Sequence, residues 1–267
     1  MSSGSRITSA SNPRYRALMK LRQSSRERRK AGLSLLDGTH LVAAYVQHVG
    51  KPHELIVGGE SAENAELAAL VDACGIEPLI LSPALFRELS TVATPTGIMA
   101  LVETPRPPAL PDEPGACVVL EDIQDPGNLG SILRSTAAAG LEEVYLSKHA
   151  VQAWSPRVLR AGMGAHFALR IHEGVDLAAL LGSYPGTVLA AASDGALPVY
   201  AADLRGRIAL LLGNEGGGLS AGIKRLAHRT IAVPMSGVVE SLNVAAAAAV
   251  CLFERVRQLT VTRDQEA

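Results

Sequence analysis

The sequence has few cysteines. Cys74, Cys117 and Cys251 are the three in 267 residues, and they are far apart in the chain. No Cys-x-x-Cys pair occurs, and no cluster of cysteine and histidine has the spacing of a zinc site. The sequence therefore excludes a disulfide framework and a structural metal, and it favours a reducing compartment such as the cytoplasm.

Long apolar runs are also missing. A bilayer-spanning helix needs about 18 or more apolar residues in succession, and the chain has no such stretch. The N-terminus is polar and basic, without the apolar segment of a signal peptide. We expect a soluble protein with no membrane partner.

Two nucleotide-binding signatures are absent as well. The segment GNLGS at 127–131 does not match GxGxxG, and neither GKS nor GKT occurs. A Rossmann dinucleotide site and a P-loop are therefore not expected.

Positive charge is balanced by acids over the whole chain but concentrated at its start. The formal net charge is −1, yet residues 1–30 carry nine basic residues and one acid, Glu27. The segment 12–30 predicts a helix with Leu18 and Leu21 inward and its basic residues outward. Such a face either is simply solvated or binds the phosphates of a polyanion; the candidates for RNA binding are Arg14, Arg16, Lys20, Arg22, Arg26, Arg28 and Arg29.

The chain is long enough for two α/β domains, and 48% of its residues are hydrophobic. Helical and strand patterns alternate up to about residue 104, including a helical pattern within 34–48 after a glycine turn. Five prolines follow within 104–114 and favour an extended linker. We therefore predict an N-terminal domain at 1–104, a proline-rich linker at 105–114 and a second domain at 115–267.

The second domain again alternates strands and helices, which predicts a parallel sheet. Pro126 and Gly127 predict a turn, and Ser131–Ala139 predicts a helix. The apolar segment Ile208–Leu212 predicts a strand that delivers Gly213, Asn214 and Glu215 to the carboxyl end of that sheet, where open α/β folds bind ligands.

The stretch from Thr230 to Glu254 combines a short strand, a small-residue turn and a long helix that begins near Ser241–Asn243. Free backbone N–H groups at such a start can receive polar ligand atoms, although Ser241 could equally be an ordinary N-cap. Ala245–Ala249 present little side-chain bulk, which favours close approach of another element or subunit.

Three segments occur together in a fixed order: NLGSILR at 128–134, LLLGNEGGGLS at 210–220 and VPMSGVVESLNVAAAAAV at 233–250. In this order they resemble the three motifs of the SpoU (TrmH-like) branch of the SPOUT RNA methyltransferases, which methylate ribose 2′-hydroxyls with S-adenosylmethionine. The N-terminal region resembles the L30e-like substrate-binding domain that precedes this catalytic domain in ribosomal RNA methyltransferases. The motif containing Asp37 has an aspartate where that domain usually has a longer acid.

The resemblance implies an α/β SPOUT domain with a parallel sheet, a deep trefoil knot and a homodimer. By motif position, it implies that the catalytic residues are Arg134, Asn128, Glu215, Ser241 and Asn243. It likewise implies that S-adenosylmethionine contacts Gly213, Val233, Met235, Leu242 and Asn243. Arg134 matches the motif arginine, whose guanidinium stays protonated, so we favour an anchoring and electrostatic role over that of a general base.

The expected activity is 2′-O-methylation of structured RNA, and the N-terminal domain favours 23S-type ribosomal RNA as the substrate. A transfer RNA ribose methylase is the alternative within the enzymes. A non-catalytic RNA-binding or ribosome-assembly protein is the alternative from another class, and the intact motif residues disfavour it.

Overall fold

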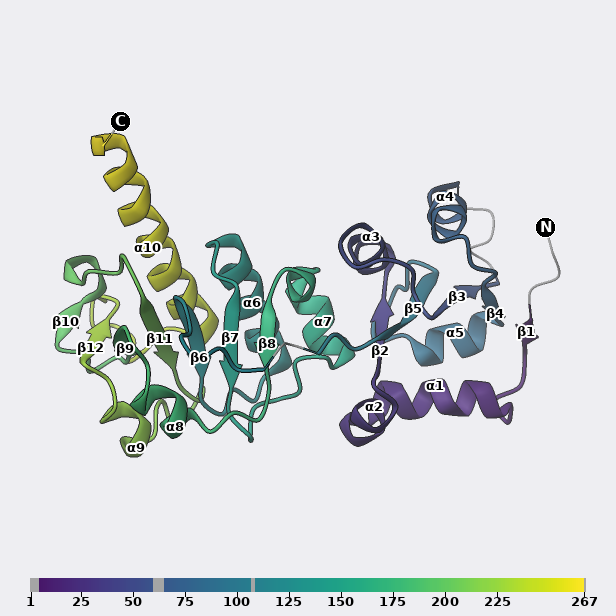
Figure 1. Ribbon diagram of the computed structural model, residues 1–267. Coiled ribbons are helices and arrows are strands. Elements are labelled where there is room, and N and C mark those ends of the chain that lie inside the picture. The colour runs from purple at the N-terminus through teal and green to yellow at the C-terminus, as the bar shows by residue number, and fades with distance from the viewer. Residues whose placement is uncertain (1–4, 60–64, 107–108, 267) are drawn as a thin grey trace. The chain divides into compact units, whose positions relative to one another are not determined.

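The protein is described here by a computed structural model that covers residues 5–59, 65–106 and 109–266 (Figure 1). Its contacts divide the chain into two compact units. The first unit is Met1–Arg106 together with Trp154–Phe167, and the second is Pro107–Ala153 together with Ala168–Ala267. Within the described residues, we find no helix that has both the length and the apolar character needed to cross a bilayer.

A five-stranded mixed sheet with the strand order β1-β4-β3-β5-β2 forms the centre of the first unit. β5 runs antiparallel to both β2 and β3, whereas β1, β3 and β4 are parallel. The strands are β1 (Arg6–Ile7), β2 (Leu33–Asp37), β3 (Glu54–Gly58), β4 (Leu79–Leu81) and β5 (Ile98–Glu103). The helices of this unit are α1 (Pro13–Gln23), α2 (Ser25–Ala31), α3 (Thr39–His48), α4 (Ala65–Cys74), α5 (Pro83–Leu89), α7 (Pro156–Gly162) and the 3₁₀ turn η1 (Ala165–Phe167).

The basic segment forms two helices, so the prediction of one continuous helix over 12–30 was wrong. Ser24 lies between α1 and α2 with extended backbone angles (φ −119°, ψ 117°), and its hydroxyl accepts a hydrogen bond from the Glu27 amide at 3.3 Å. This side-chain cap begins a new helix and turns its axis away from the first.

Another difference lies just after α2. The segment Leu33–Asp37 is strand β2, paired with β5, whereas the helix predicted within 34–48 begins only at Thr39. Gly38 separates the two elements and has φ +113°, which favours glycine.

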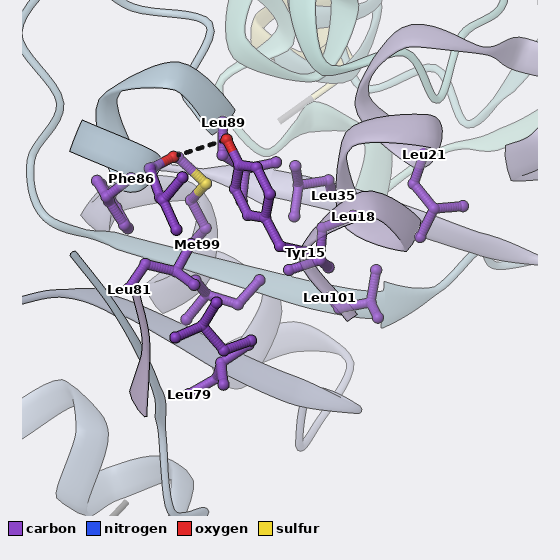
Figure 2. Close-up of a cluster of buried hydrophobic side chains, with 13 residues drawn as sticks. Tyr15, Leu18, Leu21, Leu35, Leu79, Leu81, Phe86, Leu89, Met99 and Leu101 are labelled. Carbon is purple, nitrogen blue, oxygen red and sulfur yellow. Dashed lines mark hydrogen bonds between the residues drawn. The ribbon is translucent and has the colours of Figure 1, made fainter. Parts of the chain in front are cut away.

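The core of the first unit is formed by α1 and α5 packed on one face of this sheet. Leu18 and Leu21 are buried, as the sequence predicts, and burial of a leucine stabilises by roughly 1.5–3 kcal/mol. Figure 2 shows side chains of α1 directed toward those of the strands and of α5; the labelled ones are Tyr15, Leu18, Leu21, Leu35, Leu79, Leu81, Phe86, Leu89, Met99 and Leu101.

The second unit contains a fully parallel seven-stranded sheet with the order β10-β12-β9-β11-β6-β7-β8. The strands are β6 (Cys117–Leu120), β7 (Glu143–Leu146), β8 (Arg170–His172), β9 (Thr187–Ala191), β10 (Leu197–Pro198), β11 (Ile208–Leu212) and β12 (Arg229–Ala232). β11 matches the predicted strand and is buried at all five positions, as parallel strands covered on both faces are.

The remaining elements of the second unit are helical: α6 (Pro126–Ala138), α8 (Leu177–Gly182), η2 (Val199–Ala201), α9 (Ala221–Lys224) and α10 (Val244–Glu266). The helix α6 begins five residues before the predicted Ser131. Asp125 caps it by accepting from the Asn128 amide at 2.8 Å, and Pro126 occupies the first turn, so the predicted turn at Pro126 and Gly127 is already helical. The helices α6 and α10 pack against each other (Figure 1).

Candidate active site at the carboxyl ends of the parallel strands

The sheet of the second unit reverses its direction of growth at β6. From β6 the chain adds β7 and β8 on one side, whereas β11 pairs with β6 on the other side. In open parallel sheets, this switch point leaves a crevice beyond the carboxyl ends of the strands, and ligands bind there. The predicted motif residues follow β11 or β12, lie on α6, or lie at the start of α10.

Glu215 is the centre of the hydrogen-bond network at this crevice. Its carboxylate accepts from the Asp125 amide at 2.9 Å, from the Gln124 amide at 3.1 Å and from Asn128 Nδ2 at 3.1 Å. Gln124 and Asp125 precede α6, so the carboxylate attaches the loop after β11 to the start of that helix. Two of the predicted catalytic residues, Asn128 and Glu215, are thus in direct contact.

The same hydrogen bonds set the ionisation of Glu215. Burial by itself raises the pKa of this carboxyl, but the backbone and side-chain donors stabilise the anion, and the net effect lowers the pKa below its usual value. Glu215 is therefore ionised at neutral pH and acts as an acceptor for the network.

The third motif contacts this hydrogen-bond network through Asn243. Its Nδ2 donates to Asn128 Oδ1 at 2.8 Å, and its Oδ1 accepts from the amides of Ala245 at 2.9 Å and Ala246 at 3.2 Å. Asn243 is therefore the N-cap of α10. The alternative that Ser241 is this N-cap does not hold, because Ser241 precedes the capping residue by two positions and is exposed.

The loop after β11 is shaped by its glycines and by Asn214, which sequence reasoning did not include in the site. Asn214 Oδ1 accepts from the amides of Gly216 at 2.9 Å and Gly217 at 3.0 Å, and its Nδ2 donates to the Asp122 carbonyl at 2.9 Å. A Cβ on Gly213 would lie 2.2 Å from the backbone carbon of Gly218, so this position requires glycine. The sequence predicts that Asn214 lies at the carboxyl end of β11, two residues after this buried strand, and that position was the signal that could have assigned it a role in the site.

A pocket of about 540 Å³ opens beside this network. Its walls come from the loops that follow β9, β11 and β12 and from the start of α10. Four of the predicted cofactor residues line it, namely Gly213, Val233, Met235 and Leu242, and the predicted catalytic residues Glu215 and Ser241 line it as well. Asn243 contributes through the network described above and does not itself line the pocket.

Arg134 lies on α6, six residues after Asn128, and its side chain is exposed. Within the described part of the chain, no hydrogen bond or ion pair is recorded for its guanidinium, so its charge is available to an external anion. The structure brings Asn128, Glu215 and Asn243 into direct contact, whereas Arg134 belongs to the same helix without joining that network.

The predicted RNA-binding cations of the first unit fall into two groups. Arg16, Lys20, Arg26 and Arg29 are exposed, and Arg16 and Lys20 line a groove of about 600 Å³ together with Lys30. The other three make contacts within the unit: Arg14 pairs with Glu54 at 2.7 Å, Arg22 donates to the Ser90 carbonyl at 3.2 Å, and the buried Arg28 donates to the Leu21 carbonyl at 2.6 Å.

The fold and this arrangement define the class of protein: a two-unit α/β protein with a ligand pocket at the carboxyl ends of a parallel sheet. Comparison with known proteins then gives the family. Residues 115–253 match the model of the SpoU rRNA Methylase family, and residues 12–100 match the MRM3-like substrate binding domain. The chain belongs to the SpoU rRNA methylase family and is a methyltransferase.

Similar proteins cover nearly the whole chain. An uncharacterised tRNA/rRNA methyltransferase from Synechocystis is 33% identical over 94% of this chain and 93% of its own length. The 23S rRNA (guanosine(2553)-2′-O)-methyltransferase RlmP of Bacillus subtilis is 30% identical over 92% of this chain and 97% of its own. The crystal structure of the SpoU methyltransferase AviRb from Streptomyces viridochromogenes with AdoMet superposes with a TM-score of 0.83 at 27% identity, covering 93% of this chain and 98% of AviRb.

Proposed function

We propose that this protein transfers a methyl group from S-adenosylmethionine to a ribose 2′-hydroxyl of ribosomal RNA. One observation carries the proposal: three segments far apart in the sequence converge through the contacts of Asn128 with Glu215 and Asn243, beside a ligand-sized pocket. The identity with RlmP over nearly the full length of both chains supports the same substrate class.

The pocket suits this cofactor in size and chemistry. Its volume of about 540 Å³ is within the range of roughly 300–1,000 Å³ that small-ligand sites occupy. Leu212, Ile231 and Val233 provide an apolar part for an adenine ring, and the backbone of the Gly213–Gly218 loop provides polar groups. Gly213, Val233, Met235 and Leu242 would hold the cofactor, which supplies an electrophilic methyl on its sulfonium when bound.

The residues of the network then orient the reacting hydroxyl. Asn128 and Asn243 hold each other's amide groups, and Glu215 fixes the loop that carries the pocket wall. Arg134 anchors the phosphate beside the target ribose and stabilises the developing alkoxide, because a guanidinium group carries a positive charge and presents several N–H donors. Ser241, which lines the pocket, contacts the cofactor or the RNA. Positioning of this kind accounts for much of the acceleration of a two-substrate reaction.

The two functions are divided between the predicted domains. Residues 1–104 bind the RNA, and residues 115–267 transfer the methyl group, except for the segment Trp154–Phe167, which belongs to the first compact unit. In the first domain, the exposed cations Arg16, Lys20, Arg26 and Arg29 attract RNA phosphates; Arg14, Arg22 and Arg28 support that surface through their contacts within the unit.

A homodimer is part of the proposal. The side chains of Val239, Leu242 and Phe253 are large and apolar, yet they are 57%, 39% and 49% exposed in the single chain. They lie on α10 or just before it, next to the alanine segment Ala245–Ala249. Exposed apolar side chains of this kind mark a protein contact. Threading of α10 through an earlier loop as a trefoil knot, and a cytoplasmic location, stay predictions.

The test is direct mapping of the product. The purified protein is incubated with labelled S-adenosylmethionine and with 23S rRNA, 16S rRNA or total tRNA, and 2′-O-methyl positions are mapped with and without the protein. We expect a single new site in 23S rRNA. Methylation of tRNA alone would establish the alternative substrate, and no methylation of any RNA by an S-adenosylmethionine-binding protein would favour the non-catalytic reading. A mass measurement in solution tests the dimer.

A further inference from the structure

An ion pair that the proposed reaction does not use forms one side of the pocket. Lys224 Nζ lies 2.7 Å from both carboxylate oxygens of Asp194, and both residues line the pocket. Asp194 follows β9, and Lys224 ends the short helix α9, so the pair joins two separate segments of the pocket wall.

The residues that line the pocket carry more negative than positive charge. Among the described residues that line it, three are acids, Asp194, Glu215 and Glu240, and Lys224 is the single cation. The carboxylate of Glu215 is already occupied by the donors at the start of α6. The three acids repel a ligand carboxylate in this pocket, whereas Lys224 attracts it.

The proposed cofactor carries such a carboxylate. Its amino-acid arm is a zwitterion with one ammonium and one carboxylate, whereas its adenine is an aromatic ring that suits the apolar part of the pocket. We propose that the Asp194–Lys224 pair binds the amino-acid arm of the cofactor, with Lys224 donating to the ligand carboxylate and Asp194 accepting from the ligand ammonium. This inference rests on the proposed use of S-adenosylmethionine.

The pair has the capacity for this double role. A lysine ammonium has three N–H donors, so Lys224 can keep its contact with Asp194 and still donate to a second carboxylate. Asp194 is 72% exposed and Lys224 31% exposed, which leaves both groups accessible at the wall. A purely structural pair of this exposure would add little to stability and would not distinguish one ligand from another.

The test compares two ligands that differ only in this arm. S-adenosylhomocysteine keeps the amino-acid arm, and methylthioadenosine lacks it; both bind without turnover, so calorimetry measures affinity directly. We expect Lys224→Met and Asp194→Asn each to weaken S-adenosylhomocysteine about tenfold, as loss of a partly exposed charge-assisted contact does, and to leave methylthioadenosine unchanged. Lys224→Arg keeps the cation and should restore most of the affinity.

Arg205→Met is the matched control, since Arg205 forms an exposed ion pair with Asp203 at 2.9 Å in the same unit and does not line the pocket. It should leave both affinities unchanged. Equal weakening of both ligands by Lys224→Met would assign the pair to the pocket's structure, and no weakening of either would also overturn the inference. If the unmodified protein bound neither ligand, the proposed cofactor would fail together with this inference.

Discussion

The two units present polar side chains in opposite ways. At the crevice of the second unit, the carboxylate of Glu215 and the amides of Asn128 and Asn243 have partners 2.8–3.1 Å away, and each group is held by another. On the first unit, Arg16, Lys20, Arg26 and Arg29 extend into solvent. The hydrogen-bonded arrangement at the crevice fixes the positions of its side chains, and the exposed cations of the first unit provide positive charge.

This difference determines how each region responds to substitution. A network in which every group is paired loses several contacts when one member changes, so single substitutions there have large effects that are not additive. Exposed cations act on a polyanion through their summed charge, so each contributes a small and salt-dependent share. The predictions below test this contrast from the largest expected effect to the smallest.

Arg134→Ala should abolish methyl transfer and leave cofactor affinity nearly unchanged. The side chain is exposed on α6 and does not line the pocket, so its removal affects the RNA and not the cofactor. Turnover assays measure the loss of methyl transfer, and calorimetry with S-adenosylhomocysteine measures the affinity for the cofactor. Arg207→Ala, at the amino end of β11, is the control that should retain activity. Normal turnover by Arg134→Ala would refute the assigned role.

Glu215→Gln should lower kcat/KM about 100-fold and destabilise the fold by about 1–3 kcal/mol. Asp125 and Asn128 both donate to Oε1 and the Gln124 amide donates to Oε2, so in either orientation of the glutamine amide its NH₂ group faces a donor that loses its acceptor. Kinetics and chemical unfolding measure both effects. Glu113→Gln, which alters an exposed carboxylate paired with Arg207, should change neither.

The same residue gives a pH prediction. The pKa of Glu215 is lower in the folded protein than in the unfolded chain, so its ionised form contributes stability at neutral pH, and this contribution is lost as the pH falls through the folded pKa. The glutamine variant has no such group. The difference in unfolding free energy between the two proteins should therefore shrink toward acidic pH; a constant difference would contradict it.

Local signals in the sequence located much of the second unit. The apolar run identified strand β11, and the order of the motifs identified the glycine loop and six of the residues that line the pocket. The starts of the helices α2 and α6 were not predicted, although the sequence contains signals for both. Ser24 with Glu27 has the spacing of a capping box, and Asp125 before Pro126 is a typical helix start. At Ser24 the surrounding run of helix-favouring residues outweighed the cap, and at Asp125 the turn residues Pro126 and Gly127 outweighed it.

Other features cannot be read from local patterns. Asn128 contacts Glu215 across 87 positions and Asn243 across 115, and a single sequence carries no periodicity that pairs residues so far apart. The burial of Arg28 is of the same kind. Its position in a basic run predicts exposure, but the break at Ser24 turns α2 so that the guanidinium reaches carbonyl groups of α1.

Neutralising the exposed cations of the first unit should weaken RNA binding gradually. Replacing Arg16, Lys20, Arg26 and Arg29 together with glutamine should reduce the slope of log K against log salt by about 0.7–0.9 for each phosphate contact that is lost. Binding titrations at several salt concentrations measure the slope. Lys51→Gln with Arg87→Gln removes two exposed charges elsewhere in the unit as a control. An unchanged slope would show that the RNA does not contact this surface.

Substitutions at Asn243 and Ser241 are expected to change stability less than Glu215→Gln does, and they separate capping from chemistry. Asn243→Ala should destabilise the second unit by about 1–2 kcal/mol, because the amides of Ala245 and Ala246 lose their acceptor. Asn243→Ser keeps an acceptor for these amides, but its single, shorter hydroxyl cannot reach Asn128 Oδ1 while it caps the helix, so it should recover stability and not activity. Ser241→Ala should leave the unfolding free energy within about 0.5 kcal/mol, as exposed sites do, and lower methyl transfer through its place in the pocket. Equal loss of stability in Ser241→Ala and Asn243→Ala would mean that both residues cap the helix.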